Sequence, residues 1–374
     1  MRTRRTASAI LVFVALAAVG LASGPALHAR QAGTLPDRLT DQEFWRLSQD
    51  SSEANGTFRS DNLVSNEIWL QWVIPDLLAR SRQGSVYLGV GPEQNFTYIA
   101  ALKPKMVFIT DVRRENLHMH LMYKALFELT TNRADFFALQ FNKKRPAGLT
   151  AESTAADLVN AFWNVPTSTE AEYKSNLKKV QDHLTVTRKL PLDDTDLKGV
   201  EYVYWAFYWF GPVITYNSSN TLNGGRGGGG GGNMASYGDL VMATDGANVS
   251  RGFLANEANF NVLKSLHEKN LLVPVVGNFA GPKALRAVGK YIRDHGATVA
   301  AMYLSNVEQY LRQDGIWGSF CANVASMPLD EKSMFIRSAQ QGTGGGGGGL
   351  SNSLGSMLNE TRGCTGQPES PFVR

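Results

Sequence analysis

Short apolar runs alternate with longer amphipathic stretches along most of this chain. We predict strands at Val86–Val90, in the run that ends at Asp111, at Leu271–Val276 and at Thr298–Leu304. Helical periodicity marks stretches between them, such as Arg113–Leu129 and Asn256–Lys269. Strands that alternate with helices of this length form a mostly parallel sheet covered on both faces. The pattern therefore predicts an α/β fold with a doubly wound, Rossmann-like sheet.

The residues before the first strand have helical patterns only. Thr40–Leu47 predicts a short helix capped by Thr40 or Asp41, and Ser60 or Asp61 is placed to cap a second helix that runs to Leu78. The start of this second helix is unusually polar for a segment with a buried face, with Asp61, Asn62, Ser65, Asn66 and Glu67 close together. We therefore expect an N-terminal helical extension over residues 30–84, followed by the α/β domain over 85–337.

The N-terminus has the pattern of a signal peptide, which we place at residues 1–29. Arg2, Arg4 and Arg5 precede the apolar run Ala9–Ala22, and Ala29 is a suitable cleavage position. The run is shorter than the roughly 20 residues that span a bilayer, and no later segment is long and apolar enough to do so. We expect export to the periplasm, the cell envelope or the medium, by the general secretory or the twin-arginine route.

Two glycine-rich segments and two cysteines distinguish the second half of the chain. Residues 217–233 predict a flexible surface loop, and residues 338–374 a flexible tail. Cys321 and Cys364 are the only cysteines. In an exported protein they are expected to form a disulfide, the alternative being two unrelated thiols.

Composition excludes one class of partner. The formal net charge of +4 comes mostly from the arginines of the signal peptide, and no basic stripe with interleaved aromatic residues follows. Nucleic-acid binding therefore has no support.

A hydrophobic content of 43% provides for a large core. The aromatic stretch Val200–Phe210 fits a buried strand or a helix equally well.

The turn after the first strand is the main candidate binding element. Gly89 and Gly91 let the backbone turn tightly and approach a ligand, with Glu93 and Asn95 at the start of the next helix. Asp111 lies about 20 residues further on, where nucleotide-binding folds place a carboxylate on a ribose. The plain alternatives are an ordinary strand-to-helix turn and a helix-capping acid.

Further polar residues fall where other predicted strands end. Asn278 follows Leu271–Val276, Asn306 and Glu308 follow Thr298–Leu304, and Arg113 follows Asp111. Because parallel strands end at one edge of the sheet, we expect these side chains to share a crevice with Asp111. Helix capping explains each of them singly.

No pattern in the sequence indicates a metal site or a hydrolase active site. His118 and His120 are two residues apart, so on a helix they point to different faces, and no further ligands complete a site. No nucleophile elbow or Cys/His pair stands out, and Cys321 does not lie in an electropositive turn.

The segments VYLGVGPEQN and VFITDVRR resemble the first motif and the ribose-acid strand of class I S-adenosylmethionine-dependent methyltransferases. With FRSDNLVSNE, GNFAGPKALRAVGKYI and YLSNVEQYL, they are also similar to an uncharacterised bacterial family that has this fold and includes a leptospiral hypothetical protein. The resemblance covers about residues 40–337. It implies that Gly89, Gly91 and Glu93 lie beside the methionine part of the cofactor and Asp111 beside the ribose, while Asp61, Asn62 and Asn66 close the pocket.

Two functions follow as hypotheses. The first is an exported methyltransferase-like protein that binds S-adenosylmethionine or a related nucleotide ligand and transfers a methyl group, mainly by holding donor and acceptor in line. The second is an exported binding protein that keeps the fold and the crevice without cofactor chemistry. Export favours the second, because S-adenosylmethionine is a cytoplasmic metabolite.

Overall fold

The computed structural model describes residues 34–218, 234–340 and 350–364. The predicted signal peptide and most of the predicted loop at 217–233 lie outside these residues, so those predictions stay open. No helix in the described ranges is long and apolar enough to cross a bilayer.

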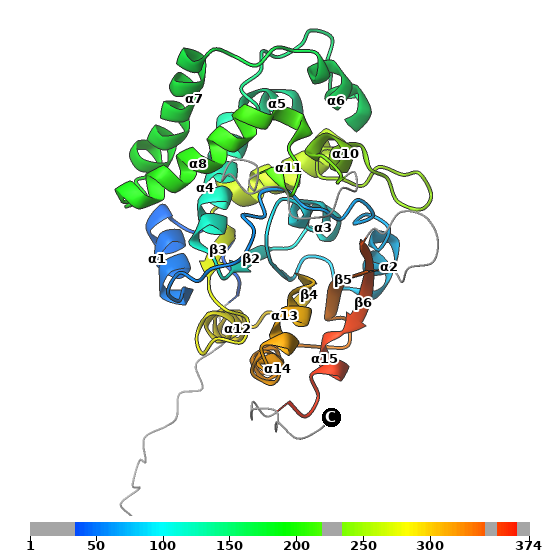
Figure 1. The fold of residues 1–374 in the computed structure, drawn as a ribbon. Coiled ribbons are helices and arrows are strands. Elements are labelled where there is room, and N and C mark those ends of the chain that lie inside the picture. Colours follow the sequence, from blue (N-terminus) through cyan, green and yellow to red (C-terminus); the bar gives the residue numbers. More distant parts are fainter. Residues whose placement is uncertain (1–33, 219–233, 341–349, 365–374) are drawn as a thin grey trace, which may run out of the picture. The chain divides into compact units, whose positions relative to one another are not determined.

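The centre of the fold is a six-stranded sheet (Figure 1). Its strands are β1 (Val86–Gly89), β2 (Met106–Asp111), β3 (Leu272–Val276), β4 (Val299–Ser305), β5 (Met334–Gln340) and β6 (Leu350–Ser356). They lie in the order β3-β2-β1-β4-β5-β6; the first five are parallel, and β6 runs antiparallel to β5. The predicted α/β architecture with a mostly parallel sheet is confirmed. The strand order reverses between β1 and β4, and ligands bind outside the carboxyl ends of the strands at such a point.

Helices cover the sheet on both sides. One group comprises α3 (Gln94–Leu102), α4 (Arg114–Leu129), α5 (Arg133–Gln140), α6 (Ala155–Trp163), α7 (Glu170–Asp182) with the π-helix η1 (His183–Thr187), α8 (Asp194–Phe210) with the 3-10 helix η2 (Gly211–Val213), α10 (Tyr237–Met242) and α11 (Glu257–Glu268). The other elements are α1 (Asp41–Ser51), α2 (Ile74–Arg80), α12 (Ala284–Asp294), α13 (Val307–Gln313), α14 (Trp317–Ala325) and α15 (Met357–Glu360). In Figure 1, α4 to α11 lie above the sheet and α12 and α14 below it.

An aromatic cluster joins the helices α3 and α4 and the segment before α11. The ring of Phe96 contacts those of Tyr123, Phe127 and Phe253 at centroid distances of 5.0, 5.7 and 5.3 Å. The edge-to-face arrangement of these rings adds a directional attraction to the burial of apolar area. The ambiguous stretch Val200–Phe210 belongs to helix α8, whose Val203 and Phe207 are buried on one face.

The predicted helix from Ser60 or Asp61 to Leu78 is wrong over most of its length. Residues 52–73, which we call the strap, contain no helix, and α2 begins only at Ile74. Asn62 has a φ of +51°, which a right-handed helix does not allow. The carboxylates of Glu53 and Glu67 in the strap are bound by distant residues, and Pro75 fixes the first turn of α2.

The strap crosses the carboxyl ends of four strands in their order in the sheet. The amide of Glu53 donates to the carbonyl of Val276 at the end of β3 (2.7 Å), and that of Gly56 donates to the carbonyl of Val112 after β2 (2.8 Å). Further along, Asn62 lies against Gly91 after β1, and Glu67 binds Ser305 at the end of β4. Between two and sixteen residues beyond α1, the chain therefore covers the edge where ligands bind in such sheets.

The C-terminal segment 338–374, expected as a flexible tail, contains regular structure in its described part. Strand β6 pairs with β5 along its whole length, and α15 follows it. Cys321 on α14 and Cys364 form a disulfide, as predicted, with a Cα–Cα distance of 5.7 Å. The bridge ties the end of the chain to the helix that precedes β5.

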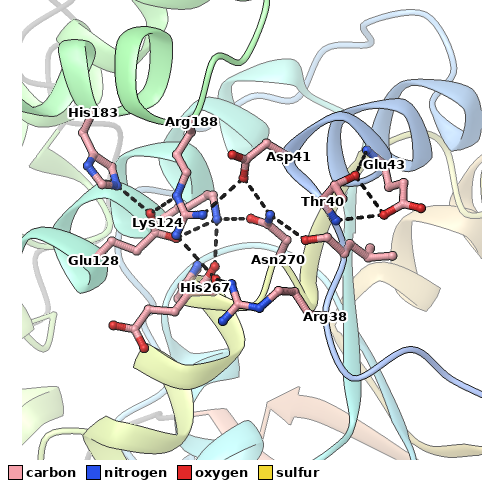
Figure 2. Close-up of polar contacts among 12 residues, drawn as sticks. Arg38, Thr40, Asp41, Glu43, Lys124, Glu128, His183, Arg188, His267 and Asn270 are labelled. Atoms are coloured by element: carbon pink, nitrogen blue, oxygen red, sulfur yellow. Dashed lines mark hydrogen bonds and ion pairs between the residues drawn. The ribbon is translucent and has the colours of Figure 1, made fainter.

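A buried ion network holds α1 against α4 and the start of β3 (Figure 2). The ammonium of Lys124 donates to Glu128 (2.7 Å), to the carbonyl of His267 (2.8 Å) and to Asn270. Arg188 binds Glu128 (2.7 Å) and Asp41 of α1 (3.2 Å), and Asn270 also donates to Asp41 (2.7 Å). The network fixes the helix from which the strap starts.

Candidate functional site

A cavity of about 220 Å³ lies beneath the strap at the carboxyl ends of β1, β2, β3 and β4. The strap contributes Thr57, Phe58, Asn62, Ser65 and Asn66, while the strand ends contribute Val90, Pro92, Asp111, Val112, Arg113, Asn278, Phe279, Tyr303, Ser305 and Asn306. Residues of α13 and of the turn after it, among them Tyr310 and Asp314, complete the wall. This is the place where a doubly wound sheet binds its ligand.

The glycine turn after β1 is tightly built around Asn95. A side chain on Gly89 would place its Cβ 2.0 Å from Oδ1 of Asn95, so only glycine fits there. Gly91 has a φ of +76°, a conformation that favours glycine. The Asn95 amide donates to the carbonyls of Val90 (2.8 Å) and Pro92 (2.7 Å) and accepts from Tyr87 (2.9 Å). The side chain of Asn95 therefore stabilises the turn and is not among the residues that line the cavity.

Asp111 and Arg113 form a buried ion pair in the cavity wall. The backbone and Nε of Arg113 donate to Oδ1 of Asp111 (3.0 and 3.1 Å), and its Nη2 donates to Oδ2 (3.2 Å). Nη1 of Arg113 also donates to the strap carbonyls of Ser60 (2.8 Å) and Asp61 (2.5 Å). Arg113 thus links the predicted ribose acid to the strap, and its charge is balanced by Asp111.

Four asparagines line the cavity; the strand-end argument named Asn278 and Asn306, and the resemblance named Asn62 and Asn66. Asn62 and Asn66 come from the strap, Asn278 from the turn after β3, and Asn306 from the end of β4. Asn278 uses its Oδ1 to accept from the amide of Ala280 (2.9 Å). Among the described residues, the side chains of the other three make no hydrogen bond. Their amides can donate to or accept from a ligand.

Two other candidates have partners away from the cavity. The carboxylate of Asp61 accepts a hydrogen bond from Tyr202 of α8. Glu308 pairs with Arg337 and accepts from the indole of Trp317 (3.1 Å). These contacts connect neighbouring elements, so both residues have structural roles, although Asp61 still contacts the site through its backbone carbonyl.

Glu93 lies behind the glycine turn, in a second and much smaller cavity of about 20 Å³. It is 4% exposed; Oε1 accepts from the amide of Ser65 (3.4 Å), while Oε2 has no partner among the described residues. Burial raises the pKa of Glu93 to about 8. At neutral pH this carboxyl is therefore protonated, and it faces an apolar space lined by residues such as Leu240 and Phe253.

Glu67 is a site residue that sequence reasoning did not select. It is 1% exposed, and its carboxylate accepts from Tyr303 (2.6 Å), Ser305 (2.8 Å), Gln94 (2.9 Å) and Asn352 (2.8 Å). The first three of these partners line the cavity. The only signal in the sequence was the density of polar residues around Glu67. Its partners come from β4, α3 and β6, far away in the sequence or beyond the strap.

Aromatic rings form much of the remaining wall. Phe58 of the strap packs edge-on against Tyr310 of α13 at a centroid distance of 5.2 Å, and both line the cavity with Tyr216 and Phe279. The guanidinium of Arg59 lies over the ring of Tyr310 (5.3 Å) and donates to its hydroxyl (2.6 Å). Aromatic and amide groups together are suited to a planar ring with polar substituents.

The two histidines of α4 have separate surroundings. Nε2 of His118 hydrogen-bonds Asp196 of α8 (2.9 Å), whereas Nε2 of His120 donates to the carbonyl of Gly91 (3.0 Å). Burial lowers the pKa of His120 to about 4, so the ring is neutral and supports the glycine turn. The described residues contain no group of three or more His, Cys, Asp or Glu side chains placed to hold a metal ion.

Comparison with known proteins identifies the family. Residues 63–194 and 229–351 match a family described as a domain of unknown function, DUF7790, and the chain therefore belongs to this family. The comparison with curated proteins gave no significant match. The matched residues include the second half of the strap, β1 to β5 and the start of β6, which together supply most of the cavity wall.

Proposed function

We propose that this protein binds a small nucleoside-type ligand, S-adenosylmethionine or a related compound, in the cavity beneath the strap. The observation that carries the proposal is that Asp111 and four asparagines from separate elements line one cavity beside the Gly91 turn. Asp111 ends the second strand, the position from which a carboxylate in such folds holds ribose hydroxyls. The aromatic rings supply faces for a base.

The chemical types of the side chains in the cavity wall fit an adenosyl group. Asp111 can accept from hydroxyls, the amides of Asn62 and Asn66 can bind the polar edge of a base, and Phe58 and Tyr310 can pack on its face. When bound, S-adenosylmethionine would supply an activated methyl group, and the protein would hold donor and acceptor in line.

Two observations favour the second candidate function, a binding protein without methyl transfer. The cavity of about 220 Å³ is below the roughly 300–1,000 Å³ of pockets that enclose drug-sized ligands, so it suits a nucleoside better than a larger cofactor. In addition, Asp111 already binds Arg113. A ligand hydroxyl at Asp111 has to share the carboxylate with this guanidinium.

Calorimetry of the mature chain with adenosine, S-adenosylmethionine and S-adenosylhomocysteine tests ligand binding. We expect micromolar affinity for at least one of them and a loss of about tenfold or more in Asp111→Asn, since hydrogen bonds to charged groups contribute about 1.5–3 kcal/mol. Asp245→Asn is the matched control, because Asp245 is also buried and paired with an arginine, Arg251, but lies outside the cavity. No heat with any of the three ligands at millimolar concentration would reject the proposal.

A second experiment separates the two candidates. The protein is incubated with S-adenosylmethionine labelled in its methyl group and with a cell-envelope preparation. Label that appears in the envelope fraction with wild type but not with Asp111→Asn supports methyl transfer. Binding without transfer of label supports the non-catalytic protein.

A further inference from the structure

Glu67 is an anion without a cationic partner in the described part of the chain. Its four hydrogen-bond partners are two amides and two hydroxyls, and no Lys, Arg or His pairs with it. All four present donors, which is the environment that a carboxylate requires. A charge buried to this extent is expensive unless its surroundings are arranged for it, so its position next to the cavity needs an explanation.

The hydrogen bonds to Glu67 determine what two wall residues can offer a ligand. Tyr303 and Ser305 each have a single O–H, and both donate it to Oε1 of Glu67. Each oxygen then retains only lone pairs, so towards the cavity these residues are acceptors. Burial and the charge of Glu67 both raise the pKa of Tyr303 well above its usual value, so its proton stays in place.

The backbone of Ser305 supports the view that this arrangement is specific. Ser305 ends β4 with a φ of +49°, in the left-handed region that non-glycine residues rarely adopt, and the register between β4 and β5 shifts there. Such a conformation persists only where its surroundings impose it, and it is found mostly at functional sites. Here it accompanies the hydrogen bond from the serine hydroxyl to Glu67.

Among the residues that line the cavity, the charge without an opposite partner is negative. Arg113 is the only Lys, Arg or His among the lining residues, and Asp111 balances it. Asp314 also lines the cavity, and Glu67 lies directly behind the wall. Arg59 is at the rim, where its guanidinium is engaged with Tyr310. The cavity lining together with Glu67 therefore carries net negative charge, and Glu67 places its share at the end of β4.

We propose that Glu67 is a positioning residue that makes the β4 side of the cavity a negatively polarised acceptor surface. This surface selects ligands that carry a primary ammonium there and disfavours carboxylates and phosphates. The inference rests on the proposed function for the identity of the rest of the ligand. It adds the charge class of the group that contacts Tyr303 and Ser305.

Two nucleosides that differ in a single group test this selection. We compare adenosine with 5′-amino-5′-deoxyadenosine by calorimetry at neutral pH, in wild type and in Glu67→Gln. In wild type the amine should bind about tenfold or more tightly, the effect of one hydrogen bond in which the donor is charged. In Glu67→Gln the two affinities should agree within about threefold. Glu257→Gln, which removes a carboxylate paired with buried Arg133 outside the cavity, should keep the wild-type ratio.

A measurement without nucleosides separates failure of this inference from failure of the proposed function. Methylammonium and acetate are titrated into the isotope-labelled protein, and the backbone amide signals of Ser305 and Asn306 are followed by NMR. Methylammonium should shift them in wild type and not in Glu67→Gln, and acetate should shift them in neither. If no nucleoside binds but this pattern is seen, the proposed function fails and the inference stands.

The reverse pattern of results would overturn the inference and leave the proposed function intact. If adenosine binds but the amine gains nothing, or if its advantage persists in Glu67→Gln, the inference is overturned and the proposed function stands. If Glu67→Gln does not fold, Ser305→Ala and Tyr303→Phe replace it. Each of them removes one acceptor oxygen and keeps the carboxylate, and each should reduce the preference for the amine. An unchanged preference in both would overturn the proposal.

Discussion

The buried network around Glu128 allows a quantitative prediction about stability. The Glu128 side chain is 2% exposed and binds Lys124, His183 and Arg188. Burial by itself raises its pKa, but the hydrogen bond from His183, the charge of Lys124 and the bond from Arg188 outweigh it and lower the pKa from 4.5 to about 2. The folded state therefore favours the ionised form of Glu128 more strongly than the unfolded state does.

The shift converts into free energy. At about 1.36 kcal/mol per pKa unit, a shift from 4.5 to about 2 corresponds to about 3 kcal/mol of stability. Because the folded pKa is depressed, this contribution is present above pH 4.5 and is lost as the pH falls through 2. Glu128→Gln should therefore lower the free energy of unfolding by about 3 kcal/mol at pH 7 and by about 2 kcal/mol at pH 3.5.

Urea denaturation at both pH values measures this difference, with Glu170→Gln as the control. Glu170 also pairs with a lysine on the same helix, but its side chain is 74% exposed, so its replacement should leave stability unchanged within error. A Glu128→Gln variant as stable as wild type at pH 7 would refute the reasoning. So would a loss that does not shrink on acidification.

Three further predictions concern the turn, its buried acid and the disulfide. Gly89→Ala should lower stability by about 1–3 kcal/mol, because its Cβ would meet Asn95; in urea denaturation the double variant with Asn95→Ala should lose less than the sum of the single changes, and strict additivity would contradict this. The raised pKa of Glu93 means that its contribution is complete below pH 4.5 and is lost as the pH rises through about 8. Replacing it in Glu93→Gln should therefore improve stability relative to wild type by about 4 kcal/mol between pH 4 and pH 8, and a pH-independent difference would show that Glu93 is ionised in the folded state. Cys321→Ser with Cys364→Ser should cost about 2–4 kcal/mol, since the bridge closes a loop of 43 residues; equal stability of wild type with and without reductant would contradict it.

Strands β1 to β4 could be predicted from sequence because they are continuous apolar runs that end in recognisable polar residues, whereas β5 and β6 were not predicted. Asp111, Asn278 and Asn306 meet in one cavity for the reason given by the topology, since parallel strands end at the same edge. The disulfide followed from the count of cysteines and the predicted signal peptide. These inferences rest on local pattern and general geometry alone.

The strap and the surroundings of Glu67 could not be predicted in the same way. The apolar positions at Leu63, Ile68 and Trp72 have helical spacing, but tertiary contacts of Glu53, Asn62 and Glu67 override this local preference. Glu67 is indistinguishable from a solvated helix residue until Tyr303 and Asn352 are placed beside it. For Asn95 and Glu308, sequence position near a strand end was correct, but the direction of the side chain was not.

The partners of Glu67 are 27, 236, 238 and 285 residues away from it along the chain. Contacts of such long range form late in folding, because much of the chain has to be ordered before they are possible. The sheet from β3 to β5 can be complete while the environment of Glu67 is not. A chain without Asn352 lacks one of the four donors to the Glu67 carboxylate. The environment of Glu67 is consequently complete only once β6 has joined the sheet, and it distinguishes the fully assembled protein from one that has merely acquired its core.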